Sequence, residues 1–286
     1  MHYRHSYHAG NFADVFKHVL LCALLQALNR KDKPWFYLET HAGAGLYDLF
    51  SEAAGKTSEW QDGIGRLLAL PEPPPPLADF LAIVRAQGKN RYPGSPRIAE
   101  ALARAGDRLV LCEKLPEIWS LLKQEMRQAR AEVHQRDGYE AHALLPPQEK
   151  RGLVLVDPPF ESRKEFELVS EFLAQATARF NNGVYAIWYP LKNRHEAQRF
   201  QRRCAREIDL PALNLEFNNG APGEGQMKAC GLLVLNPPYR FDAEIEPALK
   251  LLVRHMAQGP RPSHAMQWIK RESETTASAK KAKSRN

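Results

Sequence analysis

Short apolar runs alternate with longer segments of helical periodicity along most of the chain. Six runs are rich in β-branched and aromatic residues and predict strands at 35–39, 108–113, 131–134, 153–157, 184–189 and 231–236. Segments with apolar positions at helical spacing predict helices at 12–30, 96–105, 116–129, 163–180, 193–205 and 243–257. Strands that alternate with helices favour an α/β fold, in which helices cover both faces of an open, mostly parallel sheet.

The segment between the first two predicted strands is far longer than one crossover helix requires. Its excess, residues 50–92, is helical in pattern and includes the stiff proline-rich run 71–76. We therefore expect residues 1–49 and 93–270 to form the main domain, and 50–92 to form an inserted helical subdomain. The last residues, 271–286, are small, polar and basic, and we expect a disordered tail there.

The composition restricts the class of protein. The chain has 286 residues, 44% of them hydrophobic, which is typical of a soluble globular protein. Its longest apolar run, 19–28, is interrupted by Gln26 and is shorter than the roughly 20 residues that a membrane span needs. The four cysteines form no CxxC pair and indicate neither a zinc site nor a disulfide framework. We expect a cytoplasmic monomer with reduced thiols and no membrane segment.

The polar N-terminus contains His2, His5 and His8, which together could suggest a metal site. No carboxylate or cysteine lies at ligand spacing beside them, so we expect no metal. The same segment contains Tyr3 and Arg4, which can stack on bases and pair with phosphate. The N-terminus is therefore a candidate contact for nucleic acid.

Charge also points to a polyanionic partner. The formal net charge is +7. Residues 271–286 contain five basic and two acidic side chains, so the rest of the chain keeps a charge of 7 − 3 = +4. The segment 192–206 contains six basic residues and one glutamate. It predicts either a surface that faces RNA or an ordinary solvated helix face.

Three features follow the first three predicted strands, where α/β folds bind ligands. The turn 40–45 (Thr-His-Ala-Gly-Ala-Gly) departs from the phosphate-binding GxGxxG pattern, and Gly43 in it is typical of the looser turn of S-adenosylmethionine enzymes. Glu113 ends the second strand, where such folds place an acid for ribose hydroxyls. Asp137-Gly138 follows the third strand and suits a turn that contacts an adenine amino group. In this order, the three features predict a cofactor pocket.

The fourth predicted strand leads into Asp157-Pro158-Pro159-Phe160, a pattern typical of amino-group methyltransferases. The N6 amino group of adenine is a poor nucleophile because its lone pair is delocalised into the ring. The Asp157 carboxylate and the rigid Pro158 carbonyl can accept its N–H bonds and aim that lone pair at a methyl group. Phe160 can stack on a base flipped out of the RNA, which contributes about 1–3 kcal/mol.

A second motif, Asn236-Pro237-Pro238-Tyr239, matches the pattern of DNA adenine and protein glutamine methyltransferases more closely. Position favours Asp157, because the fourth strand of a doubly wound sheet lies beside the first. We expect Asn236 to end a hairpin strand at the far edge, as a simple turn. Two alternatives stay open: amino-group methylation of DNA or protein through Asn236, and a non-catalytic RNA-binding ribosome-assembly factor that retains a cofactor pocket.

Blocks of residues carry a more specific signal at 3–11 (YRHSYHAGN), 13–15, 17–18, 40–45, 92–96 (YPGSP) and 157–159. Together they resemble the RlmJ family of bacterial 23S ribosomal RNA adenine-N6 methyltransferases. The resemblance extends over the chain to about residue 270.

The resemblance implies a class I (Rossmann-like) S-adenosylmethionine-dependent methyltransferase fold with a helical insertion after the first strand. It implies that Asp157 is the catalytic acceptor and that Tyr3 contacts RNA, and we group Arg4 and Lys17 with Tyr3 as RNA-binding residues. It also implies a set of cofactor-binding residues: His18, His41, Ser95, Glu113, Asp137, Gly138 and Asp157. The expected reaction transfers a methyl group from S-adenosylmethionine to N6 of one adenine in 23S ribosomal RNA.

Overall fold

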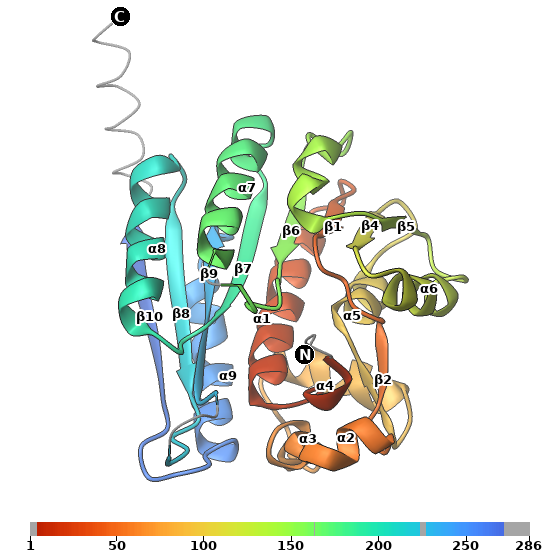
Figure 1. The fold of residues 1–286 in the computed structure, drawn as a ribbon, viewed down its shortest axis with the longest axis vertical. Coiled ribbons are helices and arrows are strands. Elements are labelled where there is room, and N and C mark those ends of the chain that lie inside the picture. The colour runs from red at the N-terminus through yellow and green to blue at the C-terminus, as the bar shows by residue number, and fades with distance from the viewer. Residues whose placement is uncertain (1–4, 163, 224–226, 272–286) are drawn as a thin grey trace, which may run out of the picture.

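A computed structural model describes residues 5–162, 164–223 and 227–271, and it is built around one eight-stranded sheet (Figure 1). The strand order is β10-β8-β9-β7-β6-β1-β4-β5. The strands span β1 Phe36–Glu39, β4 Arg108–Glu113, β5 Ala131–Gln135, β6 Gly152–Val156, β7 Val184–Pro190, β8 Ala212–Asn218, β9 Ala229–Leu235 and β10 Ser263–Lys270.

The sheet is mostly parallel, as predicted. The neighbours β5, β4, β1, β6 and β7 all run in the same direction. Strand β9 runs antiparallel to both β7 and β8, and β10 runs antiparallel to β8. The six predicted strands are all present, whereas β8 and β10 were not predicted.

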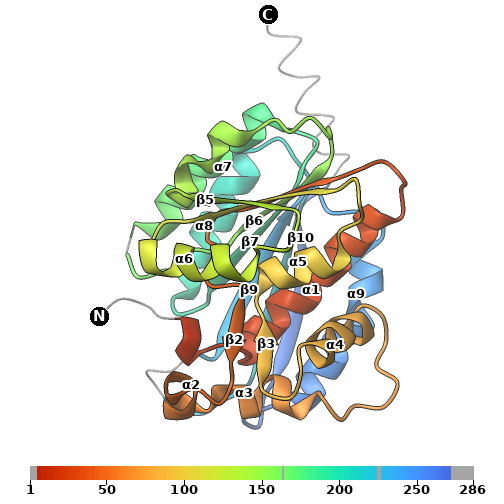
Figure 2. The same cartoon turned by 90° about the vertical axis from the view of Figure 1, so that its right-hand side faces the viewer.

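Helices cover both faces of the sheet, so that central strands such as β1, β6 and β9 are buried throughout. Two separate apolar clusters fill the two interfaces. Helices α1, α5, α6 and α9 lie on one face, and α7, α8 and the short helix η3 lie on the other. Figure 2 shows α7 and α8 on one side of the strands and α1, α5 and α9 on the other. These helices span α1 Phe12–Asn29, α5 Ser95–Leu102, α6 Pro116–Glu125, α9 Phe241–His255, α7 Glu165–Arg179, α8 Arg194–Glu207 and η3 Gly138–Leu144.

Helix α1 is the central helix of the first face. It begins at a capping residue, Asn11, whose side-chain oxygen accepts hydrogen bonds from the backbone N–H groups of Ala13 and Asp14. Its 18 residues are long and apolar enough to cross a membrane, but 83% of them are buried inside the structure. The core helix of a globular protein passes the same test of length and composition.

The chain between β1 and α5 forms a mainly helical insertion at the lower end of the molecule (Figure 2). A short antiparallel ladder of β2 and β3 joins it to the sheet domain. Helix α4 packs against α1 through apolar residues at helical spacing, which include Leu77, Phe80 and Leu81. The insertion contains β2 Leu46–Asp48, α2 Glu52–Thr57, α3 Glu59–Asp62, η2 Ile64–Arg66, α4 Leu77–Ala86 and β3 Arg91–Pro93.

Candidate active site

Asp157 and the glycine-rich turn lie at the same edge of the sheet. Strand β6 pairs in parallel with β1, so that Leu155 lies opposite Glu39. Directly after these residues, the Thr40 N–H donates a hydrogen bond to the Leu155 carbonyl over 3.1 Å. The turn 40–45 and Asp157 therefore leave neighbouring strands at their carboxyl ends, which is the arrangement that the order of the motifs predicted.

The glycine-rich turn is held from two sides. Gly43 and Gly45 have φ angles of +62° and +82°, which favour glycine. The Gly43 N–H donates to the Glu113 carboxylate over 3.0 Å, and the Gly94 N–H donates to the Gly45 carbonyl over 2.8 Å. The other oxygen of Glu113 accepts the N–H of Leu115. Glu113 thus fixes the turn, and its carboxylate lies beside Gly43. Burial raises the pKa of this carboxyl group.

Asp137 and Gly138 close the same edge from β5. Asp137 caps η3 by accepting the Tyr139 N–H over 3.0 Å, and its other oxygen pairs with Lys114 Nζ at 2.7 Å. A Cβ atom at Gly138 would lie 2.1 Å from the Thr40 carbonyl oxygen, so only glycine fits there. The His41 ring lies edge-on to Tyr139 at 5.1 Å. Burial lowers the pKa of His41 to about 4, so the ring is neutral at pH 7.

Asp157 is paired with a lysine from α1. Lys17 Nζ lies 2.5 Å from Asp157 Oδ2 and 3.1 Å from Asp14 Oδ1. Lys17 is only 4% exposed. We grouped Lys17 with the RNA contacts, but its amino group faces inward because two carboxylates hold it. Lys17 therefore forms an ion pair with Asp157, the residue that we predicted to be catalytic.

The second carboxylate, Asp14, ties the N-terminal segment to the same cluster. Its Oδ2 accepts the Gly10 N–H over 3.0 Å and lies 2.9 Å from His5 Nε2. Burial alone would raise the pKa of Asp14, but His5 and Lys17 outweigh this effect and hold the pKa well below its usual value. Asp14 is therefore a charged group in the interior. Tyr3 and Arg4, the expected RNA contacts, lie outside the described residues.

A buried carboxylic acid, Glu39, lies under the turn and was missed by the sequence analysis. Ser95 Oγ donates a hydrogen bond to one oxygen of Glu39, and Tyr37 donates to the other over 3.0 Å. The Glu39 side chain is fully buried, and burial raises its pKa to about 8. The signal was present as the last residue of the first strand. We expected Ser95 to bind the cofactor, and in the structure its hydroxyl donates a hydrogen bond to Glu39.

The raised pKa of Glu39 predicts a pH-dependent stability. The folded chain keeps a proton on Glu39 that the unfolded chain, with a pKa of 4.5, releases. This contribution is fully present below pH 4.5 and is lost as the pH rises through about 8. We expect Glu39→Gln to match the wild-type free energy of unfolding at about pH 4 and to exceed it at about pH 9, by about 1.4 kcal/mol for each pH unit between the unfolded and the folded pKa. Urea titrations measure the free energy of unfolding of both proteins at each pH. The same difference between Glu39→Gln and the wild type at both pH values would contradict a protonated Glu39.

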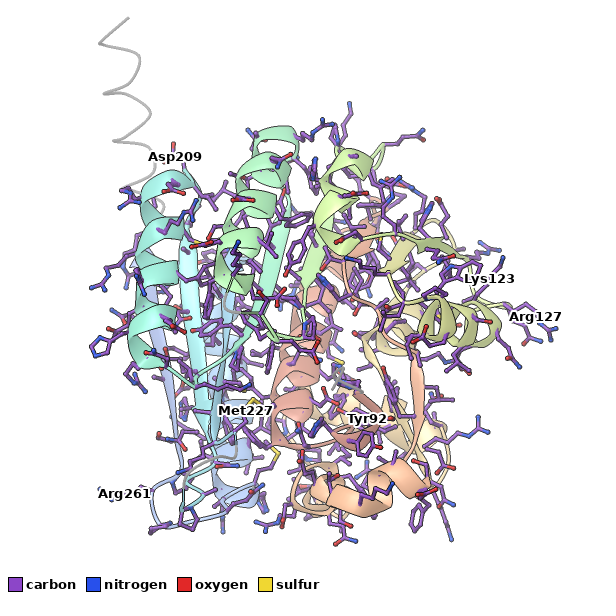
Figure 3. The ribbon with its side chains drawn as sticks, in the orientation of Figure 1. Tyr92, Lys123, Arg127, Asp209, Met227 and Arg261 are labelled. Carbon is purple, nitrogen blue, oxygen red and sulfur yellow. The ribbon has the colours of Figure 1, made fainter. Side chains whose placement is uncertain are left out.

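His18, expected at the cofactor, lies on α1, and its ring faces Phe80 and Tyr92 of the insertion. Figure 3 labels its partner Tyr92 in this region, and the Tyr92 hydroxyl lies 2.8 Å from His18 Nδ1. Within the described part of the chain, His18 Nε2 is buried and has no hydrogen-bond partner. Burial holds the pKa of His18 well below its usual value, so the ring is neutral. A bound ligand could satisfy the unpartnered nitrogen.

Phe160 begins an aromatic cluster next to Asp157. Its ring lies 5.0 Å from Phe166 and 6.0 Å from Trp188. Its φ angle of +49° is unfavourable for a phenylalanine and is typical of a functional position. Pro158 is buried and Phe160 is half-buried. The ring is thus supported from behind and retains exposed surface.

Asn236 lies at the opposite edge of the sheet from Asp157. Because β9 runs antiparallel to β7, its last residue, Leu235, lies opposite Tyr185 near the start of β7. The Asn236 side chain donates to the Gly183 carbonyl over 3.3 Å, and Tyr239 is 86% exposed. We also predicted that the strand before Asn236, β9, is the outermost strand of the sheet, and this was wrong. It lies between β7 and β8, because β8 and the unpredicted β10 extend the sheet beyond it.

Within the described residues, no group of three or more histidine, cysteine, aspartate or glutamate side chains is arranged to hold a metal ion. The four cysteines are buried and free. The candidate site therefore consists of the strand-end residues and the cluster around Lys17.

Comparison with known proteins places this geometry in a family. Residues 32–270 match the family described as "Ribosomal RNA large subunit methyltransferase D, RlmJ". The chain is 37% identical to "Ribosomal RNA large subunit methyltransferase J" of Escherichia coli (strain K12), over 93% of this chain and 98% of the relative. It is 35% identical to the Haemophilus influenzae protein of the same name, with the same coverage.

A solved structure agrees with the sequence relatives. A Legionella pneumophila protein of 36% identity superposes with a TM-score of 0.83, over 91% of this chain and 98% of that protein. The family match covers most of the chain, and the curated relatives are covered almost completely. The resemblance predicted from the sequence is thereby confirmed, and the chain belongs to the RlmJ family of large-subunit ribosomal RNA methyltransferases.

Proposed function

We propose that this protein transfers a methyl group from S-adenosylmethionine to the exocyclic N6 of one adenine in 23S ribosomal RNA. The observation that carries the proposal is the shared sheet edge of the Asp157 motif and the glycine-rich turn, joined by the hydrogen bond from Thr40 to Leu155. The names of the curated relatives, which are large-subunit ribosomal RNA methyltransferases, support the substrate class.

The residues at this edge fit S-adenosylmethionine. The buried, unpartnered Nε2 of His18 is available to a ligand, and Gly138 allows the backbone of Thr40 to approach closely. Glu113 has lone pairs left for ribose hydroxyls after it accepts two backbone N–H groups. We propose that these residues hold the cofactor together with His41, Gly43, Ser95 and Asp137. When bound, the cofactor supplies an already activated methyl group.

The chain then has to position the adenine and remove a proton. The Asp157 carboxylate and the Pro158 carbonyl accept hydrogen bonds from the N6 amino group, and Phe160 stacks on the flipped base. The ammonium group of Lys17 holds one oxygen of Asp157, at 2.5 Å. The second oxygen stays available for the amino group. Asp157 or water accepts the proton that N6 loses.

Helix α8 and the residues just before it are a further proposed contact for the RNA, away from the flipped base. Its buried side consists of Ala197, Phe200, Gln201 and Cys204. Among the described residues, Lys192, Arg199 and Arg202 are exposed without an acidic partner, whereas Arg203 and Arg206 pair with Glu207. We propose that the unpaired cations contact the RNA backbone, which would make RNA binding weaken with salt.

We propose in addition that the protein acts in the cytoplasm as a monomer, with residues 1–49 and 93–270 as the methyltransferase domain and 50–92 as its insertion. We do not propose methylation through Asn236, because its amide is bound to Gly183 at the other edge. Of the expected tail, 271–286, the residues 272–286 lie outside the described part of the chain.

Mass mapping of ribosomal RNA tests the proposed function in cells. We expect one N6-methyladenine in 23S RNA to be present with the gene and to be absent from a deletion strain. Complementation with the intact gene should restore it, and the Asp157→Ala gene should not. Identical methylation maps in all strains would contradict the proposal, and would favour a non-catalytic assembly factor.

A further inference from the structure

The insertion carries an open pocket that is separate from the candidate active site. Its volume is about 260 Å³, below the roughly 300–1,000 Å³ of pockets for drug-sized ligands. A pocket of this size suits a single ring system. Apolar side chains form one part of the lining and basic side chains the other: Leu49, Ile64, Leu68 and Val84, and Arg85, Lys89 and Arg91, with Gly88 between them.

The mouth of the pocket is positively charged. Lys89 and Arg91 are exposed and, among the described residues, have no ion-pair partner. Arg85 donates to the Leu68 carbonyl over 2.8 Å, so its charge is also uncompensated. Asp48 lies opposite Arg91 in the ladder and accepts the N–H of Phe50. The described lining contains three cations and no carboxylate, which favours an anionic ligand.

An exposed aromatic ring lies next to these cations. Phe50 is 62% exposed, and its ring lies 5.5 Å from Trp60. The N–H of the preceding residue, Leu49, donates to the Asn90 carbonyl over 2.8 Å, which places Phe50 beside the Lys89–Arg91 segment. Exposed rings among basic side chains are typical of surfaces on which unpaired bases stack.

The β2–β3 ladder fixes how far this pocket lies from the proposed cofactor turn. At one end of the ladder, Gly94 donates to Gly45 of the turn. Arg91 is three residues further along β3, which corresponds to roughly 10 Å at ~3.4 Å per residue. The pocket is therefore within reach of nucleotides close to an adenine bound at Asp157.

We propose that this pocket binds an unpaired nucleotide of the RNA that flanks the methylated adenine. The base rests on Leu49, Leu68 and Val84, and its phosphates contact Lys89 and Arg91. The inference rests on the proposed function, because it takes ribosomal RNA as the ligand. It assigns to the insertion a role in recognising the RNA around the target.

The test measures binding of a 23S RNA fragment that contains the mapped adenine, at several salt concentrations. For Lys89→Ala/Arg91→Ala we expect at least about 5-fold weaker binding, and a salt slope lower by about 1.4, since each lost single-strand phosphate contact removes about 0.7. Leu68→Trp, which fills the pocket, should weaken binding and leave the slope unchanged. The Kd for S-adenosylmethionine and the kcat at saturating RNA should stay at the wild-type values.

A matched control is Lys31→Ala/Lys33→Ala, which removes two exposed cations just before β1, at the opposite edge of the sheet. This variant should bind RNA as the wild type does. Wild-type affinity and slope for Lys89→Ala/Arg91→Ala would overturn the inference, as would equal losses in the control variant. RNA binding is measured without turnover, so a wild-type protein that binds the fragment but does not methylate it contradicts the proposed function alone.

Discussion

Replacing Asp157 with alanine should lower kcat for RNA methylation by at least about 10²–10³-fold, the usual cost of losing one directing hydrogen bond at a reacting centre. The Asp157 carboxylate can both accept an N6 hydrogen bond and take a proton, and it follows β6 directly beside the glycine-rich turn. The glycine-rich turn is held by Glu113 and Gly94, independently of Asp157. The Kd for S-adenosylmethionine should therefore change little. Single-turnover methylation and calorimetric titration measure the two quantities.

Asn236→Ala provides the matched control. Asn236 follows β9 at the opposite edge and is bound to the Gly183 carbonyl. Its replacement should leave kcat within about 2-fold of the wild-type value, because substitutions away from the site cost little. The reverse result, activity in Asp157→Ala and none in Asn236→Ala, would transfer the catalytic role to the second motif.

Replacing Lys17 with methionine should have the second-largest effect, on stability as well as on turnover. Methionine retains the length of the side chain but leaves Asp14 and Asp157 without their shared cation. Removing one partner of a buried ion pair costs about 3–5 kcal/mol. Asp14 is 4% exposed, so the cost should lie near that range. Urea unfolding gives the stability, and kcat at a permissive temperature gives the effect on Asp157.

An exposed pair serves as the comparison for Lys17. Lys56 pairs with Glu52 over 3.0 Å in α2, and both side chains are largely exposed. Lys56→Met should change the free energy of unfolding by less than about 1 kcal/mol. The double variant Lys17→Met/Asp157→Asn should recover part of the lost stability, because it removes one unpaired carboxylate. A Lys17→Met protein with wild-type stability and turnover would contradict a role for the ion pair.

The parallel half of the fold was predictable because β1, β4, β6 and β7 are local apolar runs. The adjacency of β6 and β1 followed from the topology of doubly wound sheets, and it placed Asp157 correctly beside the turn. Strand β10 alternates exposed and half-buried residues at the edge of the sheet. This strand is not a continuous apolar run, and we predicted neither β10 nor its partner β8. For this reason we wrongly predicted that the strand before Asn236 is the outermost one.

The cluster around Lys17 could not be predicted, because its partners are far apart in the chain. Lys17 and Asp157 are separated by 140 residues, and only the packing of α1 against the sheet brings them together. Glu39 was overlooked because a glutamate at a strand end usually faces solvent. Inside the protein it accepts a hydrogen bond from Ser95, which follows the insertion and is 56 residues away in the chain.

The proposed function requires that Asp157 directs the amino group of an adenine, and the RNA atom that receives the methyl group tests this. Protein-free 23S RNA is incubated with the purified protein and radiolabelled S-adenosylmethionine, and the labelled nucleoside is identified by mass spectrometry. We expect N6-methyladenosine at a single site with the wild type, and no label with Asp157→Ala. A label on another atom or base, or equal labelling by the Asp157 variant, would contradict a methyl transfer arranged at this edge of the sheet.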